Sequence, residues 1–161
     1  PSCVLMFKQE LPLLFEENKD LQRIKDHIFD PFEYLSIRES NGLMNKEFIT
    51  PLGNITYQAA CHQRVQNIGP KTKELLELIP NTEVKTIERC SGHDGTYAVK
   101  KETHHNSVKI AKPVVKKVDD SEPDYLTSDC PLAAKQIEHV SKKKLITAHP
   151  ISLIKKAYGV K

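Results

Sequence analysis

The chain has 161 residues, of which 39% are hydrophobic and 28% are charged, and its formal net charge is +3. This length suits one domain with a buried core, and the composition is that of an ordinary globular protein. Aromatic residues make up only 6% and the lysines alternate with acidic residues, so no RNA- or DNA-binding signature is present. No apolar stretch approaches the roughly 18 residues that cross a bilayer. Lys8 and Glu10 interrupt the first apolar run, so no signal peptide is expected there.

The first 45 residues are predicted to be helical. An amphipathic face over Val4–Phe15 predicts a first helix, which Pro12 should bend or divide. A second helix is expected over Asn18–Phe29. Asp30-Pro31 should open a short third helix, because aspartate caps helices well and proline suits the first turn. Ser40-Asn41-Gly42 predicts the turn that follows.

Strand and helix patterns alternate along the rest of the chain. The expected strands are Phe48–Thr50, Ile55–Ala60, Val84–Ile87, Tyr125–Thr127 and Leu145–Thr147. The expected helices are Pro70–Ile79, Tyr97–Ala111 (interrupted near Pro113 and resuming to Val118), Pro131–Val140, and Pro150–Tyr158, which Gly159 stops. This order predicts an α/β fold: a Rossmann-like, mostly parallel sheet with helices on both faces, preceded by an N-terminal helical segment.

The chain has four cysteines, too few for a small secreted disulfide scaffold. Their positions are Cys3, Cys61, Cys90 and Cys130. Without a secretion signal a reducing compartment is expected, so the predicted location is cytoplasmic, with peripheral attachment to a membrane through a partner as a further possibility. In that compartment scattered cysteines are buried apolar residues, metal ligands or reactive thiols.

Three of the cysteines follow predicted strands. Cys61, Cys90 and Cys130 each come just after a strand and before a loop or helix. Because sites in open parallel sheets form at the carboxyl ends of the strands, these thiols are expected to converge. Gly92 and Gly95 flank the loop after Cys90, whose backbone amides could donate to sulfur. A single cysteine in such a place is more often core packing, but three at one edge favour a metal or cluster site.

The sequence around these thiols resembles the cysteine-rich CCG domain family. The resemblance rests on Tyr57-Gln-Ala-Ala-Cys61-His62, on Glu88-Arg-Cys90-Ser-Gly-His-Asp-Gly-Thr-Tyr-Ala-Val-Lys100 and on Thr127-Ser-Asp-Cys130-Pro-Leu-Ala133. The family includes the heterodisulfide reductase B subunit, the C subunit of anaerobic glycerol-3-phosphate dehydrogenase, and the iron–sulfur subunits of lactate and glycolate oxidases. Its members usually carry two such domains in tandem.

This resemblance implies a domain organisation. Residues 1–45 are expected to be a helical remnant of a preceding CCG domain and its linker, and residues 46–161 a second CCG-type α/β domain. Pro1-Ser2-Cys3 resembles the end of the first domain's Cys-Pro-x-Cys motif, so Cys3 would be the last ligand of another site. A missing first domain would leave an apolar helix face uncovered, and self-association is predicted as one result.

The resemblance also implies an iron–sulfur cluster, but two of the family's cysteines are replaced. Ser91 stands within Cys-Cys-Gly, and Ala133 ends Cys-Pro-x-Cys. The predicted ligands are Cys61, Cys90 and Cys130, with His93 as the candidate fourth, because a cubane cluster normally takes four protein ligands. His93 could equally be a loop histidine bonded to the backbone. Further cofactor-binding residues are expected at Gly92, Gly95, His62 and Cys3.

The favoured function is therefore a [4Fe–4S]-type electron-transfer module of a multi-domain or multi-subunit oxidoreductase, a redox part that performs no substrate chemistry itself. Its expected partners are other redox subunits or a flavoprotein dehydrogenase. Three further hypotheses remain open at this point. They are a structural zinc site with three cysteines and one histidine, a thiol enzyme with Cys90 or Cys130 as nucleophile, and a cluster-free scaffold for partner binding.

Overall fold

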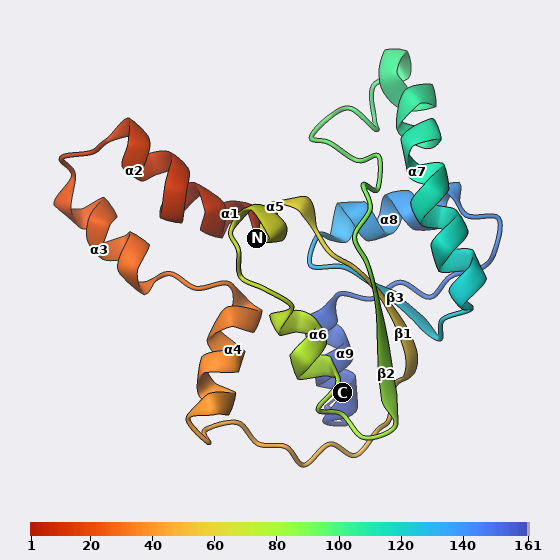
Figure 1. Ribbon diagram of the computed structural model, residues 1–161, viewed down its shortest axis with the longest axis horizontal. Coiled ribbons are helices and arrows are strands. Elements are labelled where there is room, and N and C mark those ends of the chain that lie inside the picture. The colour runs from red at the N-terminus through yellow and green to blue at the C-terminus, as the bar shows by residue number, and fades with distance from the viewer. Residues whose placement is uncertain (161) are drawn as a thin grey trace.

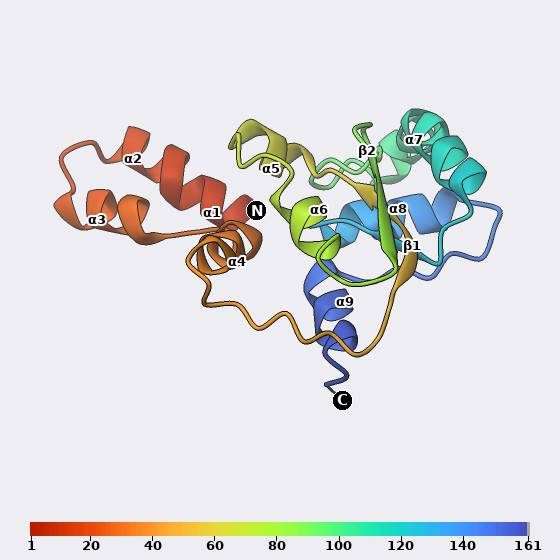
Figure 2. The ribbon, with the colours of Figure 1, turned by 60° about the horizontal axis from the view of Figure 1, so that its bottom comes forward.

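The predicted N-terminal helical segment is present in the computed structural model, which describes residues 1–160. Its elements are α1 (Ser2–Leu5), the π-helical turn η1 (Met6–Glu10), α2 (Leu11–Leu14), α3 (Lys19–His27) and α4 (Pro31–Ser40). The rod formed by α1, η1 and α2 extends to one side of the molecule, and α3 folds back beside it (Figures 1 and 2). The division predicted near Pro12 takes the form of the π-helical turn just before it.

Side-chain caps explain where α3 and α4 begin. The Asn18 side chain accepts hydrogen bonds from the backbone of Asp20 and Leu21. The Asp30 side chain caps α4 by accepting a hydrogen bond from the backbone amide of Phe32. The Glu33 carboxylate accepts one from the backbone amide of Asp30, which completes a capping box. α3 ends at His27, two residues short of the predicted end, because Ile28 is already extended.

The second part of the chain forms a three-stranded parallel sheet with the strand order β2-β1-β3, so the predicted α/β fold is confirmed. Its elements are β1 (Gly53–Gln58), α5 (Cys61–Val65), α6 (Lys71–Leu76), β2 (Thr82–Ile87), α7 (Lys101–Ser121), β3 (Tyr125–Thr127), α8 (Pro131–Val140) and α9 (Pro150–Ala157). In the central strand β1, Ile55 pairs with Val84 of β2 and with Tyr125 of β3.

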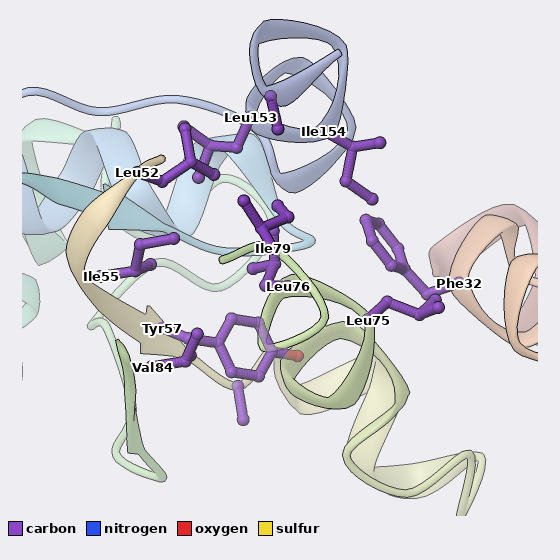
Figure 3. Close-up of a cluster of buried hydrophobic side chains, with 12 residues drawn as sticks. Phe32, Leu52, Ile55, Tyr57, Leu75, Leu76, Ile79, Val84, Leu153 and Ile154 are labelled. Atoms are coloured by element: carbon purple, nitrogen blue, oxygen red, sulfur yellow. The ribbon is translucent and has the colours of Figure 1, made fainter. Parts of the chain in front are cut away.

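Each face of the sheet packs against its own helices. On one face Ile55 and Tyr57 meet α6, α9 and Phe32 of α4 (Figure 3). On the other face Leu126 of β3 packs with Ile137 of α8 and the apolar side of α7. Successive residues of a strand point to opposite faces. Ile55 and Tyr57 of β1 therefore join the first layer, while Thr56 between them bonds Ser121 of α7.

Two of the predicted strands are wrong. In the segment Phe48–Thr50 the backbone amides of Ile49 and Thr50 both donate to the carbonyl of Ala157 at the end of α9, so this segment does not join the sheet. The segment Leu145–Thr147 contributes only an isolated parallel bridge between Thr147 and Leu126. Phe48 and Leu145 pack against the two apolar layers without a strand ladder, while Ile49 and Ile146 are exposed.

α7 also differs from its prediction. It begins at Lys101, four residues after Tyr97, and runs to Ser121 without the interruption expected near Pro113. Val114 and Val118, beyond the proline, are fully buried in the α7–α8 layer. This packing keeps the helix continuous despite the donor that proline lacks. Across residues 1–160, no helix is both long enough and apolar enough to cross a membrane.

Candidate functional site

The three strands end at the same edge of the sheet. β1 lies in the middle, with β2 on one side and β3 on the other. The chain therefore adds its second strand on one side of β1 and its third strand on the opposite side. In parallel α/β sheets a crevice opens at the carboxyl ends of the strands where the order changes side in this way. Each of the three segments that leave these strand ends carries a cysteine.

Two of these cysteines stand at the start of a helix. Cys61 is the first residue of α5, which follows β1 after the extended residues Ala59 and Ala60. Cys130 is the N-cap of α8, with Pro131 in the first turn, as the sequence predicted.

The third cysteine lies in the loop between β2 and α7. The backbone amide of Gly92 donates to Cys90 Sγ at 3.4 Å, a contact of the kind expected from the glycine-flanked loop. Gly92 has a φ of +78°, and a Cβ there would lie 2.3 Å from the carbonyl oxygen of Ser107 in α7. Ser107 Oγ donates to the Gly92 carbonyl at 2.7 Å. Only glycine therefore allows this approach of the loop to α7.

The three thiols line a single cavity of about 420 Å³. Cys61 and Cys90 are exposed to it, and Cys130 is partly buried. Three other residues that were expected at the site also line the cavity: His62, His93 and Gly95. Asp94, between the last two, lines it as well. The structure thus brings together segments that follow three different strands.

Two of the residues expected to bind the cofactor do not line this cavity. Gly92 lies behind Cys90, against α7, and Cys3 is an exposed residue of α1. His62 does line it. His62 Nδ1 is hydrogen-bonded to Ser2 Oγ at 2.7 Å, and this bond connects α5 to α1.

The thiols are close enough to affect one another electrostatically. Burial raises the pKa of Cys61, and the neighbouring thiols of Cys90 and Cys130 raise it further. Arg64 opposes this effect. Negative charge on Cys61 is therefore unfavourable without a compensating cation, and a bound metal centre would supply that compensation. The donor set and its electrostatics fit a thiolate-ligated metal group.

The side chains do not enclose a single metal ion in the arrangement observed. Among residues 1–160, no three His, Cys, Asp or Glu side chains come close enough together to hold one ion. The ligand set of Cys61, Cys90, Cys130 and His93 therefore stays a prediction.

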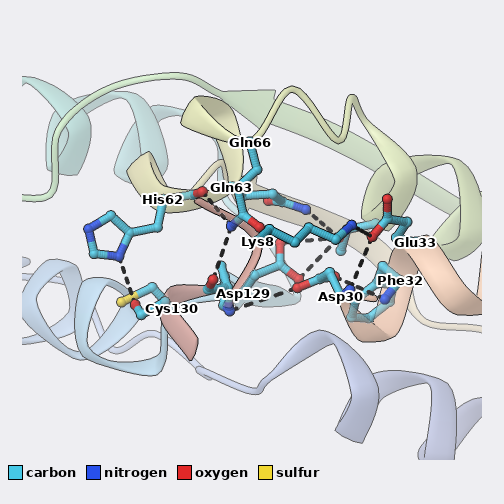
Figure 4. Close-up of polar contacts among 12 residues, drawn as sticks. Lys8, Asp30, Phe32, Glu33, His62, Gln63, Gln66, Asp129 and Cys130 are labelled. Atoms are coloured by element: carbon cyan, nitrogen blue, oxygen red, sulfur yellow. Dashed lines mark hydrogen bonds and ion pairs between the residues drawn. The ribbon is translucent and has the colours of Figure 1, made fainter. Parts of the chain in front are cut away.

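A buried polar network beside the Cys130 segment was missed by sequence reasoning. Asp129, which precedes Cys130 in the chain, accepts hydrogen bonds from Tyr57 Oη at 2.5 Å and from Thr72 Oγ1 at 3.0 Å. Figure 4 labels Asp129 and Gln63 among the polar side chains of this region. Gln63 of α5 bonds both Tyr57 and Thr72. Burial raises the pKa of Asp129, and burial together with the Asp129 carboxyl raises that of Tyr57. The only hint in the sequence was the polar pair Ser128-Asp129 directly after a strand.

Fold and site together define a class of protein: a parallel α/β domain with a cysteine-lined cavity at the carboxyl edge of its sheet. A family model for the cysteine-rich domain CCG matches residues 55–138, and the chain belongs to this family. The matched region contains Cys61, Cys90 and Cys130 but not Cys3.

Two curated relatives are components of a dehydrogenase. The chain is 29% identical over 157 residues to the C subunit of the anaerobic glycerol-3-phosphate dehydrogenase of Escherichia coli K12 and, equally, to that of Escherichia coli O157:H7. The alignment covers 97% of this chain but only 38% of each relative. No solved structure matches.

Proposed function

We propose that this chain is an iron–sulfur electron-transfer module of a multi-domain or multi-subunit oxidoreductase. The observation that carries the proposal is the cavity into which all three strand-end cysteines open. Membership of the cysteine-rich family and similarity to a dehydrogenase subunit support the same assignment. The cluster would exchange single electrons, while substrate chemistry would take place in another domain or subunit.

In this proposal Cys61, Cys90 and Cys130 supply the thiolates and His93 the fourth ligand. The Gly92 amide that donates to Cys90 Sγ, and the N-terminus of α8 at Cys130, would stabilise negative charge on the sulfurs. A histidine ligand would raise the reduction potential relative to a site with four cysteines.

The proposal extends to the organisation of a longer protein. We assign residues 1–45 to the end of a preceding CCG domain and its linker, and residues 46–161 to a second CCG domain. The coverage of 38% of the relatives' length is consistent with this assignment. The partners we propose are other redox subunits or a flavoprotein dehydrogenase.

The test is anaerobic reconstitution with iron and sulfide, followed by iron analysis, visible absorption and EPR. Wild type should bind iron and show a broad sulfur-to-iron charge-transfer band. Cys61→Ala, Cys90→Ala and Cys130→Ala should each lose both. Cys3→Ala is the matched control, because Cys3 does not line the cavity, and it should retain iron. Wild type that binds no iron and behaves like the variants would refute the proposal and favour a cluster-free scaffold.

The same series tests the fourth ligand and the alternative metal. His93→Ala should change the EPR spectrum or the reduction potential, whereas His105→Ala, at an exposed position of α7 that does not line the cavity, should leave both unchanged. A donor set of three cysteines and one histidine also suits zinc. A protein that binds one zinc per chain and no iron under reconstitution would establish the structural zinc site.

A further inference from the structure

Gln58 is a buried polar residue at the carboxyl end of the central strand. It is the last residue of β1, it is 1% exposed, and its side chain borders the cysteine-lined cavity. A buried amide is costly unless its donors and its acceptor are all bonded. The partners of this amide explain its place in the fold.

The Gln58 side chain contacts all three cysteine-bearing segments. Its Nε2 donates to the carbonyl of Arg89, the residue before Cys90, at 3.0 Å. The same nitrogen donates at 3.0 Å to the carbonyl of Ala59, on the segment that leads to Cys61.

The other end of the amide connects to the third cysteine. Gln58 Oε1 accepts from Ser128 Oγ at 2.8 Å, and Ser128 Oγ in turn accepts from the backbone amide of Cys130 at 3.2 Å. One side chain thus joins the three segments through bonds no longer than 3.2 Å.

The chemistry of these partners requires an amide in this orientation. Two backbone carbonyls can only accept, so they must face the two N–H groups of the amide, and the Ser128 hydroxyl must face its oxygen. A carboxylate would turn an oxygen toward both carbonyls, and an apolar side chain would leave all the partners unpaired.

The far side of the Cys90 loop is fastened in a similar way. Ser107 Oγ of α7 donates to the Gly92 carbonyl, and Gln136 Nε2 of α8 donates to Ser107 Oγ at 2.8 Å. Both residues are buried. The loop is therefore anchored before and after Cys90, and Gln58 is the anchor that it shares with the other two cysteines.

We propose that Gln58 is a positioning residue that holds the three thiols in a preorganised ligand set. The part of this inference that concerns a metal centre rests on the proposed function. The part that concerns thiol geometry applies to the metal-free protein as well, so the two can be tested separately.

The first measurement is made on metal-free, reduced protein carrying Cys3→Ser, so that only the cavity thiols remain. The probe is phenylarsine oxide, which binds tightly only when two thiols lie close together. Wild-type geometry should bind one equivalent. Gln58→Met should weaken binding by about 10- to 100-fold, the usual effect of losing a residue that orients ligands.

Two companion variants separate positioning from stability. Thr56→Val is the matched control: Thr56 is on the same strand and 1% exposed, but its hydroxyl bonds Ser121 of α7. It should retain the wild-type affinity for the arsenical. Ser128→Ala removes only the link to Cys130 and should weaken binding, which keeps the test valid if Gln58→Met does not fold.

The second measurement records iron content, EPR spectrum and reduction potential after reconstitution. Gln58→Met should lose iron or shift the spectrum and potential, and Thr56→Val should do neither. If wild type binds no iron but Gln58→Met still weakens arsenical binding, the proposed function fails and the positioning role stands.

The inference is overturned in either of two ways. One is that Gln58→Met and Ser128→Ala bind the arsenical as tightly as Thr56→Val, with the same iron signature. The other is that wild type binds the arsenical no better than a monothiol does, because the thiols are then not preorganised. In the first case the proposed function survives if wild type holds iron.

Discussion

Tyr57 shows at the scale of a single residue how this fold handles buried polarity. Its ring packs in the apolar layer with α6, while its hydroxyl bonds Asp129 and Gln63. The ring contributes to the core, and the hydroxyl satisfies groups that are out of reach of water. The same residue therefore supports both the sheet and the segment that carries Cys130.

Removing that hydroxyl should be costly. Tyr57→Phe is expected to lower the free energy of unfolding by about 1–3 kcal/mol, because buried partners are left with an unmade bond. Urea denaturation would measure the difference. Tyr34→Phe is the control: Tyr34 is exposed and should change stability by less than about 0.5 kcal/mol. Equal effects of the two variants would contradict the role of the network.

Glu138 on α8 provides a pH-dependent contact at the same scale. Its carboxylate accepts hydrogen bonds from Lys135 at 2.7 Å and from Thr147 at 2.5 Å, and these bonds lower its pKa. A carboxyl group with a lowered native pKa stabilises the fold above its unfolded pKa. That stabilisation is lost as the pH falls through the native value.

The Glu138 contact should therefore stabilise the fold at neutral pH and not in acid. At pH 7 Glu138→Gln should destabilise the protein by less than about 1 kcal/mol, because the side chain is partly exposed and solvent screens the pair. The difference should shrink below about pH 4.3, the ordinary glutamate value, and vanish at lower pH. Thermal unfolding across this range is the measurement. Glu83→Gln, at an exposed position of β2, should show no such trend.

At the scale of elements, the seam between the Cys90 loop and α7 determines the shape of the site. The loop approaches the helix so closely that Gly92 leaves no room for a methyl group beside the Ser107 carbonyl. Gly95, in the same loop, also has a positive φ, of +49°, but nothing lies within 4 Å of where a Cβ would stand at its position. Both glycines thus have a left-handed backbone, but only Gly92 is also packed closely against another segment.

Alanine at each position should distinguish the two effects. Gly95→Ala incurs only the strain of a left-handed backbone, about 1–2 kcal/mol. Gly92→Ala adds a collision with backbone and should exceed it by roughly 1–3 kcal/mol. Chemical denaturation would give both values. A Gly92→Ala protein as stable as Gly95→Ala would show that the loop can move away from α7.

At the scale of the whole molecule, the helical arm formed by α1, η1, α2 and α3 exposes apolar side chains. Leu13 and Leu14 of α2 are 73% and 72% exposed, at the end of the arm that lies away from the sheet. Contiguous apolar surface of this kind favours association. Self-association, expected from the sequence for this segment, stays a prediction.

Sedimentation velocity over a range of concentrations would test it. The wild-type sedimentation coefficient should rise with concentration, and the double variant Leu13→Ser/Leu14→Ser should abolish the rise because it removes the apolar surface. Val99→Ser is the control, since Val99 is equally exposed, at 74%, but lies outside the arm. A concentration-independent wild type would contradict the prediction.

The sequence by itself determined most of the elements and the edge at which the cysteines lie. Caps at Asn18 and Asp30, and the proline after Cys130, are local signals, and each marked a real helix start. The alternation of strands and helices was enough to predict a parallel sheet, because a parallel pair needs a crossover between its strands. That inference placed Cys61, Cys90 and Cys130 together without any knowledge of distances.

Only the tertiary structure decided what joins those elements. The false strand at Phe48–Thr50 looked correct locally but is bonded to the end of α9, about a hundred residues away along the chain. The side chains that tie the cysteine segments together, above all Gln58, look ordinary in sequence because their partners lie on distant segments. Periodicity and capping act over a few residues, whereas hydrogen bonds across a sheet edge depend on how the whole chain packs.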